Sequence, residues 1–374
     1  MRLTIISHTE HFMRPDGVIV GLGSTVTEIN HLLDVFDTIT HVAMLHEGEA
    51  PPSALPYISN NIRFVALPAV GGPRTIDKLG ILLKAPKILQ IVKTEVRASD
   101  YFQFRAPTGI GVFVIPYLMF FGKTKGWFKY AGNWIQSSPP LAYRFQKWLL
   151  TKQHRLVTIN GVWSKQPKHC LSFENPCLTT DDLRAGNVLV SKKEKRQGEI
   201  QLCFVGRLEE AKGIGFLIEA IRSLHDEEKS QIKQVHIVGD GKQKFNYLEL
   251  AKEVGVRFKF YGVLSRKEVH DIYKVSHAII LPSASEGFPK VIAEAMNYGC
   301  LPIVSNVSSI GHYIKHQKNG FLLRSIDSEG TCMAIQEFLK LSNQDYSLMT
   351  QYGIREINVF SYPYYNSRIS NDIL

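Results

Sequence analysis

The sequence predicts an α/β protein of two domains, each built around a parallel β-sheet, and three observations support this. The chain has 374 residues, which is too long for one ordinary hydrophobic core and suits two domains. Short apolar runs alternate with amphipathic segments from end to end, as in βα units. In the second half, five successive apolar runs lead into short loops, most of them containing glycine, which is typical of an open parallel sheet.

Strands and helices alternate along the first half in the order that a parallel sheet requires. Thr25 and Glu28 have the spacing of a capping box, so the first helix is expected to begin at Thr25. The Phe-Glu-Asn-Pro sequence at 173–176 interrupts regular structure, and we place the first domain at residues 1–175. Strands are expected at 3–7, 39–45, 63–67, 100–104 and 126–131, and helices at 25–33, 78–96 and 109–121.

The second half shows the same alternation more clearly. Ser265 and Glu268 repeat the capping-box spacing, and Pro289 suits the first residue of a helix. Because parallel sheets bind ligands at the carboxyl ends of their strands, a site is expected in the loops there. The second domain is placed at 176–350, followed by a C-terminal segment at 351–374. Strands are expected at 200–205, 235–238, 257–261, 277–281 and 301–304, and helices at 213–224, 265–275 and 289–298.

Composition excludes several classes of protein. The five cysteines form no Cys-x-x-Cys pair, which favours free thiols in a reducing compartment over a disulfide or zinc framework. The N-terminus lacks the apolar core and cleavage site of a secretory signal. The longest uncharged apolar stretch, at 109–121, has 13 residues, below the ~20 that a spanning helix needs. A cytoplasmic protein without a membrane span is expected.

The net charge of +10 is concentrated in the first half. Residues 74–168 contain 16 basic and three acidic residues, which indicates an anionic partner unless the lysines merely form a solvated surface. No nucleic-acid-binding motif accompanies this charge, so we expect no nucleic-acid partner. Basic residues at 123–129 alternate with Trp127 and Phe128, which suits peripheral binding at an anionic membrane surface. The alternative interpretation makes Trp127 part of a buried strand.

Two cations and two carboxylates in the second half carry the chemistry. Arg207 and Lys212 occupy one loop and suit a diphosphate, because Arg binds two phosphate oxygens and Lys acts as a point charge. Surface charge on an ordinary loop is the alternative interpretation. Glu286 and Glu294 lie in a loop and in the helix after it, so both can accept hydrogen bonds from sugar hydroxyls. Helix capping explains a single glutamate, but poorly explains this pair.

Glycine recurs after the predicted strands of the second half. It lets the backbone approach a ligand closely, although tight turns explain it equally well. The backbone amides exposed within 287–290 can also stabilise phosphate charge at the start of a helix.

These motifs resemble those of the family 4 glycosyltransferases, which have the GT-B fold. The matching pieces are 206–213, 238–241, 285–296 with its Glu-x7-Glu spacing, and Asn-Gly-Phe-Leu at 319–322. The resemblance implies two Rossmann-like domains facing a central cleft, with a C-terminal helix that crosses back to the N-terminal domain. It also implies retaining transfer of a hexose-type sugar from a UDP- or GDP-sugar, without a metal or other cofactor.

The resemblance assigns roles to individual residues. Arg207, Lys212 and Glu286 are the catalytic set, with the two cations on the diphosphate and the carboxylate on the sugar. Glu294 binds the ribose, and His8, His11 and Arg105 lie on the acceptor side. The chain departs from the family where Leu22 splits the usual glycine pair and where Ala131 replaces a common histidine. The remaining donor-site residues are Gly21, Gly23, Gly206, Gly239, Gly241, Gly262, Gly287, Phe288, Pro289 and Lys290.

The acceptor implied is a saccharide, free or linked to a polyprenyl diphosphate, as in bacterial surface-polysaccharide or glycolipid synthesis at the inner face of the cell membrane. Two alternatives stay open. One is a sugar-nucleotide 2-epimerase of the same fold, and the other is a non-catalytic subunit that binds a nucleotide sugar.

Overall fold

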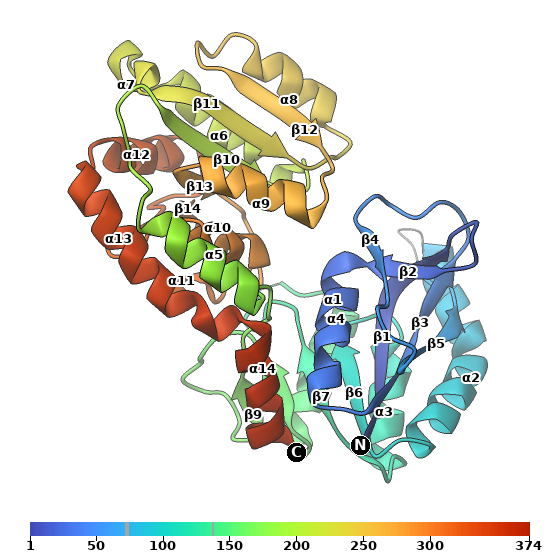
Figure 1. Cartoon of the computed structure of the whole chain (residues 1–374). Coiled ribbons are helices and arrows are strands. Elements are labelled where there is room, and N and C mark those ends of the chain that lie inside the picture. The colour runs from blue at the N-terminus through green and yellow to red at the C-terminus, as the bar shows by residue number, and fades with distance from the viewer. Residues whose placement is uncertain (72–74, 137) are drawn as a thin grey trace. The chain divides into compact units, whose positions relative to one another are not determined.

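The chain divides into two compact units in a computed structural model that describes residues 1–71, 75–136 and 138–374. Unit 1 comprises Met1–Asn175 with Tyr364–Leu374, and unit 2 comprises Pro176–Pro363. Each unit is a parallel β-sheet covered by helices (Figure 1). The predicted α/β fold with two Rossmann-like, parallel-sheet domains is confirmed.

Unit 1 contains, within the described residues, a nine-stranded sheet. Seven strands run parallel in the order β5-β3-β1-β6-β7-β8-β9, and β2 and β4 form an antiparallel extension at the end of β1. The strands are β1 (Arg2–Met13), β2 (Ile19–Leu22), β3 (Thr38–His46), β4 (Ala54–Pro56), β5 (Ile62–Pro68), β6 (Tyr101–Ala106), β7 (Lys125–Tyr130), β8 (Val157–Ile159) and β9 (Cys170–Ser172). The helices are α1 (Gly23–His31), α2 (Thr75–Arg97), α3 (Gly111–Phe120), α4 (Leu141–Lys152) and, at the C-terminus, α14 (Tyr362–Arg368) with short turns at Leu32–Asp34 and Ile369–Ile373.

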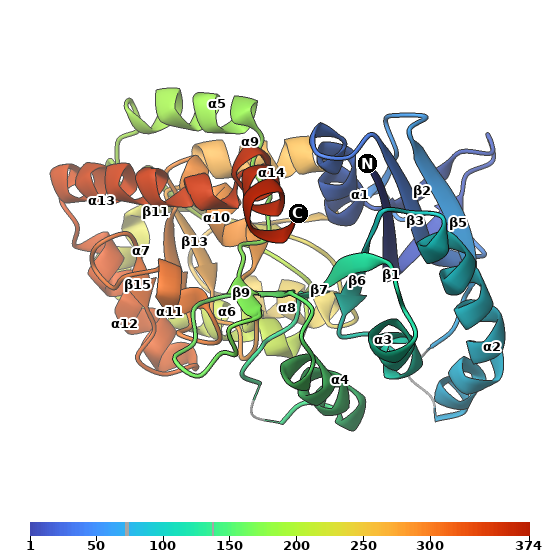
Figure 2. The same ribbon diagram turned by 90° about the horizontal axis from the view of Figure 1, so that it is seen from below.

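The core of unit 1 lies on both faces of its sheet, because successive strand residues point to opposite sides. On β7, Trp127 packs with Phe36 on the face covered by α1 and the C-terminal residues. Its neighbour Phe128 packs on the other face, beneath α2, α3 and α4 (Figure 2). Trp127 is fully buried, so the interpretation of this segment as a buried strand is confirmed.

Unit 2 contains, within the described residues, a six-stranded sheet in which every pair is parallel. Its order is β12-β11-β10-β13-β14-β15. The strands are β10 (Ile200–Val205), β11 (Ile232–Val238), β12 (Phe258–Gly262), β13 (Ala278–Leu281), β14 (Leu301–Val304) and β15 (Phe321–Leu322). The helices are α5 (Thr180–Val190), α6 (Ile214–Arg222), α7 (Asp226–Ser230), α8 (Lys244–Ala251), α9 (Arg266–Val275), α10 (Lys290–Asn297), α11 (Ile310–Tyr313), α12 (Ser328–Leu339) and α13 (Asn343–Glu356), with turns at Glu210–Lys212 and Ile357–Phe360.

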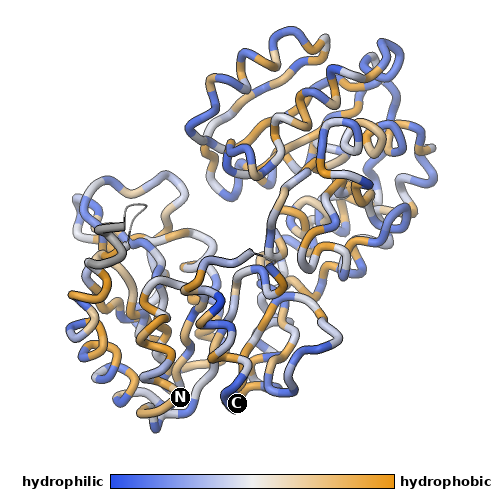
Figure 3. Tube along the Cα trace, turned by 180° about the vertical axis from the view of Figure 1, so that it is seen from behind, coloured by the Kyte–Doolittle hydropathy of each residue, from blue (hydrophilic) through white to orange (hydrophobic). Residues whose placement is uncertain are grey.

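Helix starts show where local sequence signals succeed and fail. Ser265 caps α9 and Glu268 completes the capping box, as predicted. The predicted capping box at Thr25 is wrong, because α1 begins at Gly23 and Glu28 is committed to a buried ion pair. Most helices carry both hydrophobic and hydrophilic residues within each turn (Figure 3), which is the pattern of helices packed on one side. No helix in the described part of the chain is long and apolar enough to span a membrane.

Candidate functional site

The order of strands in unit 2 places two loops side by side at the edge where ligands bind. β10 is paired with β11 on one side and with β13 on the other. The chain therefore adds β11 and β12 on one side of β10 and then adds β13, β14 and β15 on the other side. Open α/β sheets bind ligands at such a switch point, beyond the carboxyl ends of the strands. The loops that leave this edge are 206–213 after β10 and 282–289 after β13, which are the two loops singled out from the sequence.

An ion pair joins these two loops. Lys212 Nζ donates to Glu286 Oε1 at 2.5 Å, and the exposed fractions of the two side chains are 21% and 9%. The backbone reinforces this contact, since the amide of Ala284 donates to the carbonyl of Ala211 at 2.9 Å. The structure therefore brings together two of the three predicted catalytic residues at the switch point.

Arg207, the third, lies in the same loop but points into solvent. Its side chain is 72% exposed, and Nη1 is 3.1 Å from Glu209 Oε1. No ion pair within the described residues joins it to Glu286. A guanidinium on such an exposed tether can reach a ligand by rotation about its side-chain bonds.

Glycines hold the loops together by close backbone packing. Gly239 has φ of +131°, and a Cβ atom there would lie 1.9 Å from the carbonyl oxygen of Gly206. At Gly241 a Cβ atom would lie 2.4 Å from the carbonyl oxygen of Leu208. Loop packing thus accounts for glycine at both positions. Gly206 is open to added atoms, and Gly262 ends β12 with φ of +73°.

The loop after β13 leads into α10, whose first amides have no side-chain cap. Pro289 is the residue before the helix, and Ser309 Oγ fixes the loop by donating to the carbonyl of Gly287 at 3.0 Å. The expectation that Phe288 lines the pocket is wrong for its side chain. That ring is buried and stacks on Phe360 with 4.5 Å between centroids, so it belongs to the hydrophobic core. Uncapped amides beside Lys290 at a helix N-terminus favour an anion.

Glu294 lies one turn further along α10 and is half-buried. The pKa values of Cys177 and Tyr273 are raised first by the burial of these two groups and second by the negative charge of Glu294. The carboxylate of Glu294 therefore lies on the side of α10 near α9 and the start of unit 2. It has no hydrogen-bond or ion-pair partner among the described residues. Its carboxylate is therefore available to an added hydroxyl donor.

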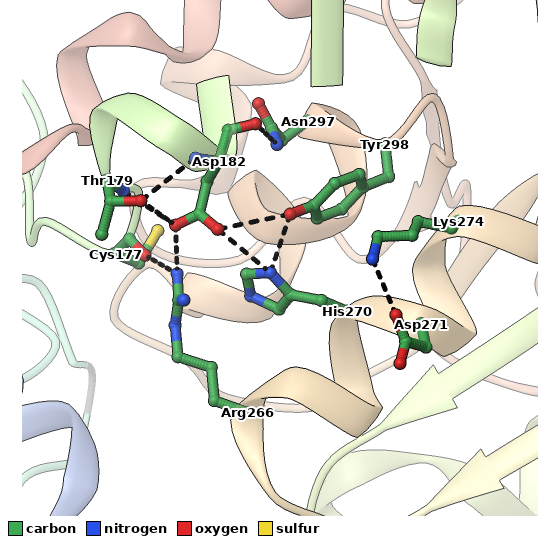
Figure 4. Close-up of polar contacts among 9 residues, drawn as sticks. All are labelled: Cys177, Thr179, Asp182, Arg266, His270, Asp271, Lys274, Asn297 and Tyr298. Carbon is green, nitrogen blue, oxygen red and sulfur yellow. Dashed lines mark hydrogen bonds and ion pairs between the residues drawn. The ribbon is translucent and has the colours of Figure 1, made fainter. Parts of the chain in front are cut away.

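A polar cluster around Asp182 fixes α5, α9 and α10 to one another, and no sequence motif indicated it (Figure 4). Arg266 Nη2 donates to Asp182 Oδ2 at 2.6 Å, and Tyr298 donates to Oδ1 at 3.3 Å. Although burial opposes ionisation, hydrogen bonds from His270 and Arg266 hold the pKa of Asp182 well below its usual range. The cluster thereby secures the helix that carries Glu294. No group of three metal-ligating side chains occurs in the part of the chain that the structure describes.

The acceptor-side histidines lie in unit 1 at the end of β1. His8 Nε2 is 2.8 Å from the carbonyl oxygen of Val70 and its side chain is partly buried. His11 is fully buried, with Nδ1 at 3.0 Å from the Thr9 carbonyl oxygen and Nε2 at 2.9 Å from Tyr57 Oη. Because both of its ring nitrogens are used, the expectation that His11 faces a ligand is wrong.

Arg105 is likewise committed within unit 1. It donates to Glu28 Oε1 at 2.9 Å and to Gln103 Oε1 at 2.9 Å, and its side chain is 11% exposed. A side chain held in this way does not face outward, which corrects the expectation of an acceptor contact. Local packing accounts for glycine at positions 21 and 23. A Cβ atom at Gly21 would lie 2.3 Å from the His11 ring, and one at Gly23 would lie 2.5 Å from the Ser53 carbonyl oxygen.

Buried neutral histidines predict that acid destabilises both units. Burial lowers the pKa of His11 in unit 1, and of His236 and His277 in unit 2, to about 4. The unfolded chain binds protons near pH 6.5, so the free energy of unfolding is at its full value above that pH. It should fall by up to about 1.4 kcal/mol per pH unit per histidine between pH 6.5 and 4. Denaturant titrations across this range measure the slope. His236→Gln should reduce it, whereas substitution of the exposed His154 should not; equal slopes would contradict the prediction.

Residues 188–355 match the family described as glycosyl transferases group 1. This segment belongs to that family. It contains both loops of the switch point and α10, so the family assignment covers the site just described. The predicted resemblance to the family 4 glycosyltransferases is therefore confirmed for this part of the chain.

Relatives of this family match parts of the chain. An uncharacterized glycosyltransferase of Methanocaldococcus jannaschii is 35% identical over 125 residues, or 33% of this chain and 31% of that protein. One of Haemophilus influenzae is 31% identical over 224 residues, or 56% and 60%. A UDP-Gal:alpha-D-GlcNAc-diphosphoundecaprenol alpha-1,3-galactosyltransferase of Escherichia coli is 32% identical over 130 residues, or 33% and 33%. The chain spans 31% to 60% of the length of these relatives.

Solved structures agree with the chain over nearly its whole length. Sucrose-phosphate synthase from Thermosynechococcus elongatus has a TM-score of 0.73 at 16% identity, covering 99% of this chain and 97% of that one. The Anabaena protein HepE in complex with UDP-glucose has a TM-score of 0.69 at 16% identity, covering 99% and 98%. The fold is therefore GT-B, as predicted.

Proposed function

We propose that the protein is a retaining glycosyltransferase that transfers a hexose from a UDP-sugar to a saccharide or lipid-linked saccharide acceptor. The ion pair between Lys212 and Glu286 carries the proposal, because it sets a cation and a carboxylate together at the switch point of unit 2. A nucleotide-diphosphate sugar needs both: a cation for its phosphates and a carboxylate for its sugar hydroxyls. The family of residues 188–355 and the GT-B fold support the reaction class.

In this proposal the bond between the sugar carbon and the diphosphate oxygen breaks as the acceptor oxygen bonds to that carbon from the same face, and the hydroxyl proton passes to the departing diphosphate. Negative charge grows on the departing diphosphate, and Lys212, Arg207 and the uncapped amides of α10 stabilise it there. Glu286 orients the sugar, and the unpartnered Glu294 accepts hydrogen bonds from the ribose. Charges held in place before reaction lower the barrier without reorganising during it.

Two similar proteins favour uridine as the base. The name of the Escherichia coli relative gives UDP-Gal as its donor, and HepE was solved with UDP-glucose. We also propose a lipid-linked acceptor and a role in surface-polysaccharide synthesis, because the name of the same Escherichia coli relative includes diphosphoundecaprenol.

Thermal unfolding with added nucleotides tests the donor. UDP, UDP-glucose and UDP-galactose should stabilise the protein, by about 2.7 kcal/mol at a hundredfold excess over the dissociation constant, and GDP should stabilise it less. A UDP-sugar should then be consumed only when a saccharide acceptor is supplied. Stabilisation by GDP alone would overturn the uridine assignment. Conversion of UDP-N-acetylglucosamine without acceptor would establish an epimerase, and binding without turnover would establish a non-catalytic subunit.

A further inference from the structure

One stretch of unit 1 has a one-sided charge. Residues 101–173 contain no Asp or Glu, although they make up about a fifth of the chain. They contain ten basic residues: Arg105, Lys123, Lys125, Lys129, Arg144, Lys147, Lys152, Arg155, Lys165 and Lys168. Only Arg105 and Lys129 of these reach a carboxylate, that of Glu28, among the ion pairs of the described residues. The stretch as a whole therefore keeps an excess of positive charge.

Helix α4 carries an apolar stripe on its outer face. Its inner face buries Gln146, Leu149 and Leu150, and Gln146 attaches it to the loop before α3 by donating to the Thr108 carbonyl at 2.8 Å. The opposite face exposes Leu141, Phe145 and Trp148, which are spaced at i, i+4 and i+7 and so form one line along the helix. The Phe145 and Trp148 rings stack with 6.2 Å between centroids.

The neighbouring helix also exposes aromatic side chains. α3 packs beside α4 (Figure 2), and its end exposes Phe120 and Phe121, the latter at 73%. Exposed cations flank both helices, with Arg144 and Lys152 on α4 and Lys123 and Lys125 after α3. Exposed apolar side chains that line one face of a helix, as on α4, mark an interaction site.

A cavity of about 370 Å³ opens beside the last turns of α4. Lys147, Lys152 and Lys165 line it together with Trp134 and Trp163. Lys147 Nζ lies 5.0 Å from the centre of the Trp134 ring, so a cation is held at its wall. Lysine ammonium groups around a hollow of this size suit a phosphate head group.

We propose that α4 and the end of α3 dock unit 1 on the surface of an anionic lipid bilayer. Apolar and aromatic side chains on one face of a helix enter the boundary between head groups and acyl chains, and flanking cations bind the lipid phosphates. The complete lack of carboxylates over 101–173 removes the repulsion that such a surface would otherwise meet. This docking stands apart from the proposed sugar transfer, and its failure would leave the donor site untouched.

Co-sedimentation of the full chain with vesicles tests the docking. Binding to an equal mixture of phosphatidylcholine and phosphatidylglycerol should exceed binding to phosphatidylcholine alone and should weaken with salt. Each cation contributes about fivefold to partitioning, so R144Q/K152Q should bind about 25-fold more weakly. The matched control K233Q/K267Q removes two exposed lysines of unit 2 and should bind like the unsubstituted protein. Equal binding to the two vesicle types, or equal binding of the two double variants, would overturn the proposal.

The fluorescence of Trp148 gives a second readout, which binding through charge alone would not change. Trp148 is 55% exposed, whereas Trp127 and Trp134 are buried and Trp163 is half-buried, so anionic vesicles should shift its emission to the blue. Trp148→Phe should remove most of the shift and still bind. F145Q/W148Q should lower binding, whereas F245Q, at an exposed phenylalanine of unit 2, should not. If F145Q/W148Q instead dissociates a dimer without vesicles, the face binds a second copy of the chain and the proposal fails.

Discussion

Replacing Lys212 with alanine is expected to lower sugar transfer about 10²–10³-fold while unit 2 stays folded. The ammonium group of Lys212 is the cation at the switch point, so the variant lacks one of the groups that stabilise the charge of the departing diphosphate. Glu286 would lose its partner as well, and its free carboxylate would repel a diphosphate at the same place. Initial rates at saturating and limiting UDP-sugar measure the loss, and thermal unfolding of the variant checks the fold.

Lys252 provides a matched control for this substitution. It also belongs to unit 2 and also pairs with a carboxylate, that of Glu249 at 2.7 Å, but it is 65% exposed and away from the switch point. Lys252→Ala should keep its rate within about twofold, because exposed ion pairs contribute little. If Lys212→Ala turned over like Lys252→Ala, Lys212 would have no part in the reaction.

Combining substitutions tests whether the pair acts as a unit. If Lys212 and Glu286 hold one donor molecule between them, the double variant Lys212→Ala/Glu286→Gln should be little slower than the slower single variant. Losses that multiply would show that the two residues act independently, which the 2.5 Å contact between the loops does not favour.

The sheet of unit 2 and its site loops could be predicted from the sequence because their signals are local. Each strand from β10 to β14 is a largely apolar run followed by a turn, and the direction of a parallel sheet then brings the following loops to one edge. The contact between Lys212 and Glu286 follows from that topology, although the residues are 74 positions apart. Family motifs over the same loops added the expected roles.

Several predictions failed where distant residues decide a side chain's environment. Glu28 has the spacing of a capping residue, but Lys129 and Arg105 lie on neighbouring strands and take its carboxylate. Phe288 follows a glycine in a motif that indicates a pocket, yet Phe360 covers its ring. Helix α4 escaped prediction because its apolar residues are divided between an inner and an outer face. No pattern within a short window distinguishes these outcomes.

Replacing Glu28 with alanine is expected to destabilise unit 1 by about 3–5 kcal/mol. Arg105 and Lys129 both contact Glu28 Oε1, at 2.9 and 2.5 Å, and the three side chains are 3% to 11% exposed. Without the carboxylate, two buried cations face each other in a medium that solvates neither. Lys129 Nζ also lies 4.8 Å from the centre of the Tyr365 ring, so the loss reaches the C-terminal residues 364–374. Urea unfolding measures the free-energy change, and limited proteolysis should release this C-terminal end faster.

A second substitution separates charge burial from lost packing. Lys129→Met in the Glu28→Ala background removes one of the two buried cations and keeps an apolar stem of similar length, so part of the lost stability should return. Asp16→Ala is the matched control in the same unit, because Asp16 pairs with Arg14 at the surface, where the two side chains are 47% and 48% exposed. That change should cost less than about 1 kcal/mol. If Glu28→Ala were as mild as Asp16→Ala, the triad would not hold unit 1 together. If Lys129→Met failed to restore stability, the loss would come from packing around Glu28 and not from the two buried positive charges.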